Sequence, residues 1–258
     1  LGMTAKVNED INVNFGIASG GDDPISTNQT IGSGFSSKSV VIDIASFDYA
    51  IAEGIGFTGG KMKNPFFRPA KSELIWDGDL RPEGVSFNYK SDLFFANSGA
   101  FQIEERSSLT NSAMYQVQAG TRLNLGSAKL IIGAGMFNYS VLDSNYCELY
   151  ELFGELSTPT SLTLFFDYVT NSDADEKNEA FQYGVKYGKA KKVGSWSARV
   201  LYKEVEVNSV YADFTDSDFA GGGTGGKGYE ANLEANGFRR TKEGDIDLEF
   251  LLENSKEN

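Results

Sequence analysis

Apolar and polar residues alternate with a period of two along most of the chain. From residue 4 to 18, apolar side chains occupy the odd positions and amide or charged side chains mostly the even ones, with Glu9 the exception. The same alternation runs from residue 114 to 125, where Val117 and Gln118 fall on opposite parities. Successive side chains of a strand point to opposite faces, so this period predicts strands with one apolar and one wet face.

The alternation predicts about thirteen strands, most of them about 9 to 13 residues long. Soluble strands average only about 5 or 6 residues, whereas a tilted strand that crosses a bilayer needs about 9 to 11. The expected strands are 3–19, 39–51, 54–63, 84–91, 93–104, 113–125, 128–140, 149–157, 161–170, 179–188, 195–207, 227–238 and 245–253.

The connections between these strands alternate in length. Those at 125–128, 157–160 and 189–194 are tight, whereas those at 19–39 and 207–227 are long and polar, as are 105–112, 140–146 and 170–179. A soluble β-sandwich also alternates apolar and polar residues, but strict alternation of short turns with long loops is typical of outer-membrane barrels. We therefore expect an all-β protein, a transmembrane antiparallel up-and-down β-barrel of the bacterial outer membrane. Residues 1–258 would form its single domain.

An odd number of strands does not suit such a barrel. Single-chain bacterial barrels have an even number of strands, because an odd antiparallel count closes one seam in parallel. The chain opens directly into a patterned segment and ends in Ser-Lys-Glu-Asn rather than on an aromatic residue. We therefore expect a chain truncated at both ends, from a complete barrel of about 14 to 18 strands.

Composition argues against most catalytic chemistry. Histidine is absent, which removes Ser-His-Asp, Cys-His and HExxH sites, and the single Cys147 cannot form an intramolecular disulfide or a cysteine-rich zinc site. With 36 acidic and 23 basic residues and a net charge of −13, the chain has little electrostatic reason to bind nucleic acid. We expect no enzyme activity, no catalytic or metal-binding residues and no cofactor.

One connection, residues 59–84, differs from the others. It mixes basic residues with an acidic cluster and contains Trp76, one of two tryptophans. Long loops with apolar anchors are usually packed and functional. The candidate anchors here are Phe66, Phe67, Leu74, Ile75 and Trp76.

The run GGKMKNPFFRPAKSELIWDGDLRPEGV at residues 59–85 resembles the signature segment of the bacterial putative-porin family, and ASGGDDPISTNQT at 18–30 is similar to it as well. The resemblance covers most of the chain and implies an outer-membrane porin that lets small hydrophilic solutes or ions diffuse passively through a water-filled lumen. In general-diffusion porins one long loop folds into the barrel and narrows the channel. By analogy of position, we expect residues 61–83 to do so here.

Charged side chains of this loop would then form a pore constriction, with opposed charges filtering solutes by size and charge. The alternative interpretation is that they form ordinary surface ion pairs. The candidate constriction residues are Lys61, Lys63, Arg68, Lys71, Glu73, Asp77, Asp79, Arg81 and Glu83.

The polar parity of the strands supplies candidate lumen-facing residues of both signs, which predicts weak selectivity. The acidic total suggests a mild cation preference, although loop charges contribute most of it. The candidates are Lys6, Asn12, Asn14, Gln116, Gln118, Arg122, Lys186, Arg199, Lys203, Glu230, Glu234, Asp247 and Glu249.

The expected partners are outer-membrane lipid, lipopolysaccharide and small hydrophilic solutes, and the porin analogy allows a homotrimer. The alternative function is a non-porous barrel whose extracellular loops bind a partner or a surface polymer. Two further motifs resemble ligand-binding loops, but neither predicts a binding site. The glycine-rich run 221–228 lacks the final Ser or Thr of a phosphate-binding loop, and Asp213, Asp216 and Asp218 fit a solvated loop better than a calcium site.

Overall fold

A computed structural model describes residues 1–21, 23–26, 34–35, 37–105, 107, 111–140 and 147–236. The expected strand 245–253, with the candidate residues Asp247 and Glu249, lies outside the described residues. Residues 22 and 27–30 of the motif 18–30 lie outside them as well.

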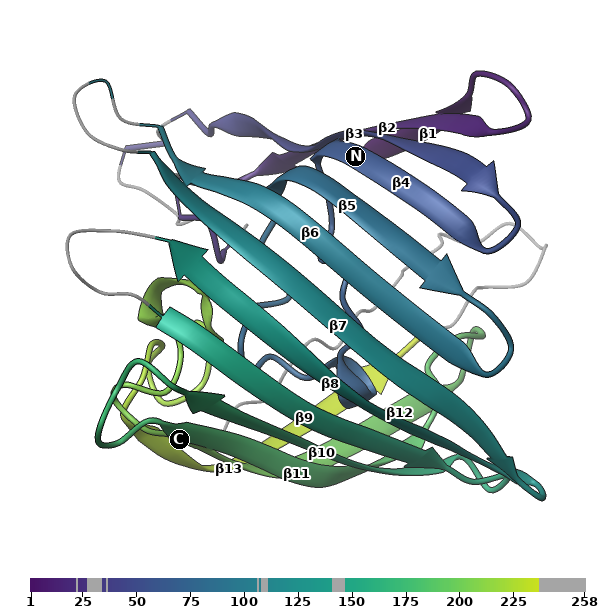
Figure 1. The fold of residues 1–258 in the computed structure, drawn as a ribbon, viewed down its shortest axis with the longest axis vertical. Coiled ribbons are helices and arrows are strands. Elements are labelled where there is room, and N and C mark those ends of the chain that lie inside the picture. Colours follow the sequence, from purple (N-terminus) through teal and green to yellow (C-terminus); the bar gives the residue numbers. More distant parts are fainter. Residues whose placement is uncertain are drawn as a thin grey trace.

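The described residues form one sheet of thirteen antiparallel strands, in which each strand pairs with the next in chain order. Almost all other residues lie in connections, so the expected all-β, antiparallel up-and-down architecture is confirmed (Figure 1). The strands are β1 (Gly2–Lys6), β2 (Ile11–Ser19), β3 (Val40–Ala52), β4 (Ile55–Lys61), β5 (Glu83–Lys90), β6 (Phe94–Glu104), β7 (Ser112–Leu125), β8 (Ala128–Ser140), β9 (Cys147–Ser157), β10 (Leu162–Asn171), β11 (Glu179–Gly188), β12 (Trp196–Val205) and β13 (Gly226–Ala235).

The expected single strand 3–19 is wrong, because it is a hairpin of β1 and β2. Asn8 causes the reversal: its side-chain oxygen accepts hydrogen bonds from the backbone N–H groups of Asp10 and Ile11 at 2.9 and 2.8 Å. Lys6 and Asn12 then pair across the turn, so the even parity keeps to one face through the reversal. Alternation therefore could not reveal the hairpin.

The strand order places all the long connections at one end of the sheet and all the short turns at the other (Figure 1). The helices of the described residues are two single 3₁₀ turns, η1 (Pro69–Lys71) and η2 (Ala212–Phe214), both in long connections. No helix in that part of the chain is long and apolar enough to cross a membrane.

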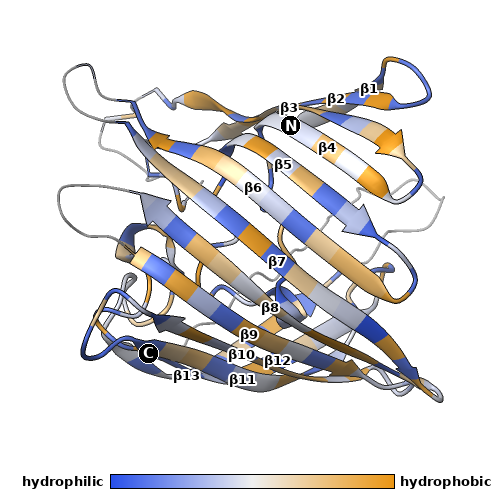
Figure 2. Ribbon diagram, in the orientation of Figure 1, coloured by the Kyte–Doolittle hydropathy of each residue, from blue (hydrophilic) through white to orange (hydrophobic). Residues whose placement is uncertain are grey.

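The two faces of the sheet differ in composition. Val117 on the outer face is 50% exposed, whereas its neighbour Gln118 on the inner face is 2% exposed. Figure 2 shows the resulting bands of apolar and polar residues along strands such as β7. An exposed apolar face opposite a polar inner face is the arrangement that a lipid-facing barrel wall requires.

The inner face itself changes character along the strands. Near the long-connection end, residues of β6 to β12 such as Phe101, Leu149 and Val205 join a buried apolar cluster. Deeper in the sheet the same face carries buried polar groups, among them Gln118, Asp167 and Lys203. The β4–β5 and β12–β13 connections supply the remainder of the apolar cluster.

Candidate functional site

The β4–β5 connection, residues 62–82, lies against the inner face of the sheet; we call it the inner segment. Its base is closed by the hydrogen bond from the Met62 N–H to the Pro82 carbonyl at 3.0 Å and by the Lys61–Glu83 ion pair at 2.7 Å. The segment then crosses to strands far from its own in the sheet order, touching β7, β9, β10 and β12. In Figure 1 its helical turn η1 appears as a short blue coil within the curve of the sheet.

Polar side chains of the sheet fix the backbone of the inner segment. The Gln118 amide of β7 accepts from the Phe67 N–H at 2.8 Å and donates to the Phe67 carbonyl at 2.9 Å. The Ala70 N–H donates to Glu155 at 2.8 Å, and Arg199 donates to the Ala70 carbonyl at 3.2 Å. Each of these bonds satisfies a backbone group that would otherwise be isolated from water.

Apolar side chains from both halves of the segment anchor it against the sheet. Leu74 is 0% and Trp76 is 1% exposed. The Trp76 indole N–H donates to the Tyr139 hydroxyl at 2.9 Å, and the Phe66 ring packs against Phe137 at a centroid distance of 5.6 Å. Such burial of large aromatic residues stabilises the docked conformation of a loop of this length.

The β12–β13 connection packs onto the inner segment, so the expectation of a solvated loop at Asp213, Asp216 and Asp218 is wrong for Asp216, while Asp213 and Asp218 are exposed. The Asp77 N–H donates to the Phe214 carbonyl at 2.7 Å, and Ser217 donates to the Asp77 carboxylate from both its N–H and its hydroxyl, each at 2.9 Å. Asp216 is buried and forms an ion pair with Lys203 of β12. Apolar residues near the start of this connection, Val210 and Phe214, are the sequence signal of this packing.

These contacts account for the acidic residues that resembled a calcium-binding loop. Asp216 forms an ion pair with Lys203, and Asp213 accepts a hydrogen bond from the Tyr211 hydroxyl at 3.3 Å. Across the described part of the chain, no group of three or more carboxylate, cysteine or histidine side chains is placed to hold a metal ion.

Most of the nine candidate constriction residues have partners. Arg68 lies 3.8 Å from Glu73, and Arg81 lies 2.9 Å from Asp43 of β3 and 3.8 Å from Asp79. Besides the Lys61–Glu83 pair, Lys71 contacts Glu234 of β13 at 3.3 Å, and Asp77 accepts the hydrogen bonds from Ser217. Lys63 is exposed, and its ammonium has no ion pair in the part of the chain that the structure describes.

Where the two connections meet, burial shifts the pKa values of charged side chains of the inner segment. Desolvation, reinforced by the neighbouring carboxylates of Asp216 and Asp77, raises the pKa of Glu73 to about 7. Desolvation likewise raises the pKa of Asp77 and lowers that of Arg68. Three carboxylates thus crowd one spot, with Arg68 as the nearest cation to Glu73.

The candidate lumen-facing residues fall into three groups. Gln116 and Gln118 of β7 are buried. A second group forms ion pairs on β11 to β13, with Arg199 and Lys203 near Glu230 at 2.8 and 3.6 Å, and Lys186 4.0 Å from Glu234. The third group lies toward β1 and the short turns and is less buried: Lys6, Asn12, Asn14 and Arg122.

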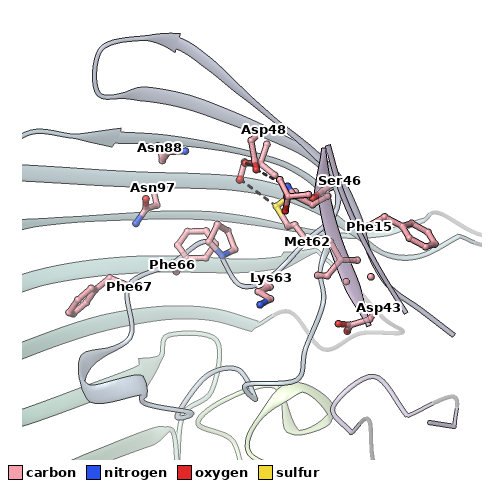
Figure 3. Close-up of a pocket in the computed structure, with 18 of the residues that line it drawn as sticks. Phe15, Asp43, Ser46, Asp48, Met62, Lys63, Phe66, Phe67, Asn88 and Asn97 are labelled. Atoms are coloured by element: carbon pink, nitrogen blue, oxygen red, sulfur yellow. Dashed lines mark hydrogen bonds between the residues drawn. The ribbon is translucent and has the colours of Figure 1, made fainter. Parts of the chain in front are cut away.

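A cavity of about 890 Å³ lies between the inner segment and strands β1 to β7. Figure 3 shows Ser46 and Asp48 on one side of it and Lys63, Phe66 and Phe67 of the segment on the other. Its walls combine hydroxyl, amide, carboxylate and cationic groups with apolar side chains, in contrast to the uniformly apolar cluster on the other side of the segment. A second space of about 560 Å³, lined by charged residues of β11 to β13, lies beside Lys71 and Glu73.

Sequence analysis missed several residues of the larger cavity. Ser46, Asp48, Asn88 and Asn97 all line it, yet none was among the candidates. The signal was present in the pairing of polar positions: Asp48 pairs with Asn12 and Thr58, and Asn88 pairs with Asn97. Neighbouring strands thus carry two rows of paired polar residues.

Solved structures with a similar arrangement include two porins. Salmonella typhi OmpF, in complex with daunomycin, is 12% identical with a TM-score of 0.48, covering 90% of this chain and 87% of that one. An anion-selective porin from Comamonas acidovorans is 15% identical with a TM-score of 0.41, covering 85% of this chain and 68% of that one. No curated protein matches the sequence. A family model described as "Putative porin" matches residues 1–165 and 155–242. This match extends over nearly the whole chain, and the protein therefore belongs to that porin family.

Proposed function

We propose that the protein is an outer-membrane channel through which small hydrophilic solutes or ions diffuse passively, past the inner segment. The observation that carries this proposal is the asymmetry of the two sides of that segment. Toward β8 to β12 it packs into a buried apolar cluster, whereas toward β1 to β7 it faces a cavity of about 890 Å³ whose walls carry charged, amide and hydroxyl side chains among apolar ones. Water and hydrated solutes favour the second side, because exposing an apolar surface to water costs free energy.

In this proposal the inner segment narrows the lumen mainly by its volume. Its charges are largely neutralised by ion pairs and hydrogen bonds, so they contribute less to filtering solutes by charge than was expected of the candidate constriction residues. The hydrogen bonds from Gln118, Glu155 and Arg199 hold its backbone against the wall. The segment is therefore expected to act as a fixed restriction.

The test is electrical. Purified protein added to a planar lipid bilayer should produce stepwise increases in conductance, and graded poly(ethylene glycol)s should reduce that conductance only below a limiting size. Correctly folded protein, verified by its β-sheet circular dichroism, that yields no steps would refute the proposal and favour the non-porous barrel with binding loops. A channel that admits polymers as wide as an unobstructed lumen would refute the narrowing.

The same proposal places the chain in the bacterial outer membrane, in contact with lipid and lipopolysaccharide through its exposed apolar face. Trimer formation stays a prediction. Light scattering of the detergent-solubilised protein gives the number of chains directly.

A further inference from the structure

The charged residues that line the large cavity differ in how they are paired. Asp43 lies 2.9 Å from Arg81 and is neutralised by it. Asp48 accepts hydrogen bonds from the Asn14 amide at 2.7 Å and the Thr58 hydroxyl at 2.8 Å. No cation pairs with Asp48 among the described residues, so it is the one unneutralised carboxylate of this lining.

Three cations line the same cavity without an ion pair among the described residues: Lys63, Lys90 and Arg122. The Arg122 guanidinium lies 4.3 Å from the centre of the Phe95 ring, a contact that orients it and leaves its charge uncompensated. Lys63 is on the inner segment, just after the long-connection end of β4, whereas Lys90 and Arg122 lie near the short turns. Cations therefore occur toward both ends of the cavity.

Resting on the proposed function, we propose that the pathway through this cavity prefers small anions, such as chloride, phosphate or short carboxylates, to cations. The nearest uncompensated charges determine which ions enter a narrow aqueous space, since at physiological salt a charge is screened beyond about 8 Å. Much of the excess acidity that gives the chain its net charge of −13 lies outside this lining. The preference is thus the reverse of the mild cation preference that the composition suggested.

One competing group lies close by. Glu9 and Asp10, in the turn between β1 and β2, line a neighbouring hollow that also contains Asp48 and Lys90. These carboxylates lie at the short-turn mouth, outside the lining of the larger cavity. The proposal requires that the residues of the larger cavity outweigh them.

The experiment is the reversal potential of bilayers containing the full chain in a potassium chloride gradient. The wild-type sign should show chloride preference. Lys63→Gln and Arg122→Gln should each lower the chloride-to-potassium permeability ratio by about twofold, the size expected for one charge at about 8 Å in water, and Asp48→Asn should raise it. Lys191→Gln, an equal charge change in the exposed connection between β11 and β12, is the matched control and should leave the ratio unchanged.

The outcomes separate this inference from the proposed function. Absence of conductance in folded protein counts against the channel itself. A conducting but cation-preferring wild type overturns the inference and leaves the channel intact. Ratios unchanged by both Lys63→Gln and Arg122→Gln, or a larger effect of neutralising Glu9 and Asp10 than of Asp48→Asn, also overturn it, because the charge filter would then lie elsewhere.

Discussion

At the scale of single residues, polar side chains on the inner face of the sheet form hydrogen bonds with the backbone N–H and carbonyl groups of the inner segment. Gln118 is the clearest case, since its amide satisfies both backbone groups of Phe67. The Glu155 carboxylate and the Arg199 guanidinium do the same for Ala70. Gln118 and Arg199 can be assigned to the inner face from parity alone, whereas both parities of β9 carry apolar residues and leave Glu155 unassigned. The bonding partners of all three are on a loop more than fifty residues away and could not be inferred.

Replacing Gln118 should loosen the first half of the inner segment. In Gln118→Ala the N–H and carbonyl of Phe67 lose their partners, which costs roughly 1 to 3 kcal/mol if they remain buried. We expect faster hydrogen exchange at the Phe67 amide and noisier single-channel currents.

Gln116→Ala is the matched control. Gln116 lies two residues earlier on the same face of β7, is equally buried, and its amide has no hydrogen-bond partner in the described structure. Equal exchange rates and equal noise in both variants would contradict the role given to Gln118.

At the scale of elements, the strands follow from the sequence and the packed connections do not. The predicted strands from β3 to β13 agree with the structure to within a few residues, because period-two alternation is set by the pleat itself. The hairpin of β1 and β2 was not predicted, because the even-numbered residues stay on the same face of the sheet before and after its turn. The β12–β13 connection was misjudged because its acidic residues suggested solvent, while Val210 and Phe214 were available to bury.

The meeting point of the two connections should depend on pH through Glu73. Its pKa of about 7 lies above the usual value of 4.5, so the packed state favours the protonated carboxyl. Packing is then most stable below about pH 4.5, weakens as the pH rises toward 7, and changes little above that. Hydrogen exchange across residues 68–77 should become faster from pH 5 to pH 8, after correction for the intrinsic rate.

Glu73→Gln should remove most of this dependence, because the amide stays neutral throughout the range. At pH 8 the variant should be better protected than the wild type, even though it loses the ion pair to Arg68. A variant with the wild-type pH profile would show that another group is responsible.

At the scale of the whole molecule, the sheet separates two environments that the sequence already distinguishes. Exposed apolar residues such as Val117, Tyr183 and Leu164 form the outer face, and polar groups and the two connections occupy the inner side. Alternation predicts this division well, since it depends on parity alone. It does not predict that one half of the inner side is filled and the other left hollow, because that depends on where a loop docks.

A charge on the outer face should hinder insertion into the membrane. Val117 lies in the middle of β7, between Ser98 of β6 and Met136 of β8. Val117→Arg, near the bilayer centre, should reduce the free energy of folding into lipid vesicles by about 2 to 4 kcal/mol, as measured by urea titration. Val193→Arg, at a similarly exposed site in a short connection, should cost about 0 to 1 kcal/mol. Equal losses at the two sites would contradict a lipid-facing β7.

The bond between Asp77 and Ser217 joins residues 140 positions apart, and this separation constrains the order of assembly. Neighbouring strands can pair as soon as each hairpin forms, since every pairing in the sheet is between consecutive strands. The inner segment, in contrast, contacts β12 and the connection that follows it, and must wait for both. Its final docking is therefore among the last steps of folding, after most of the wall has been built around the space that it occupies.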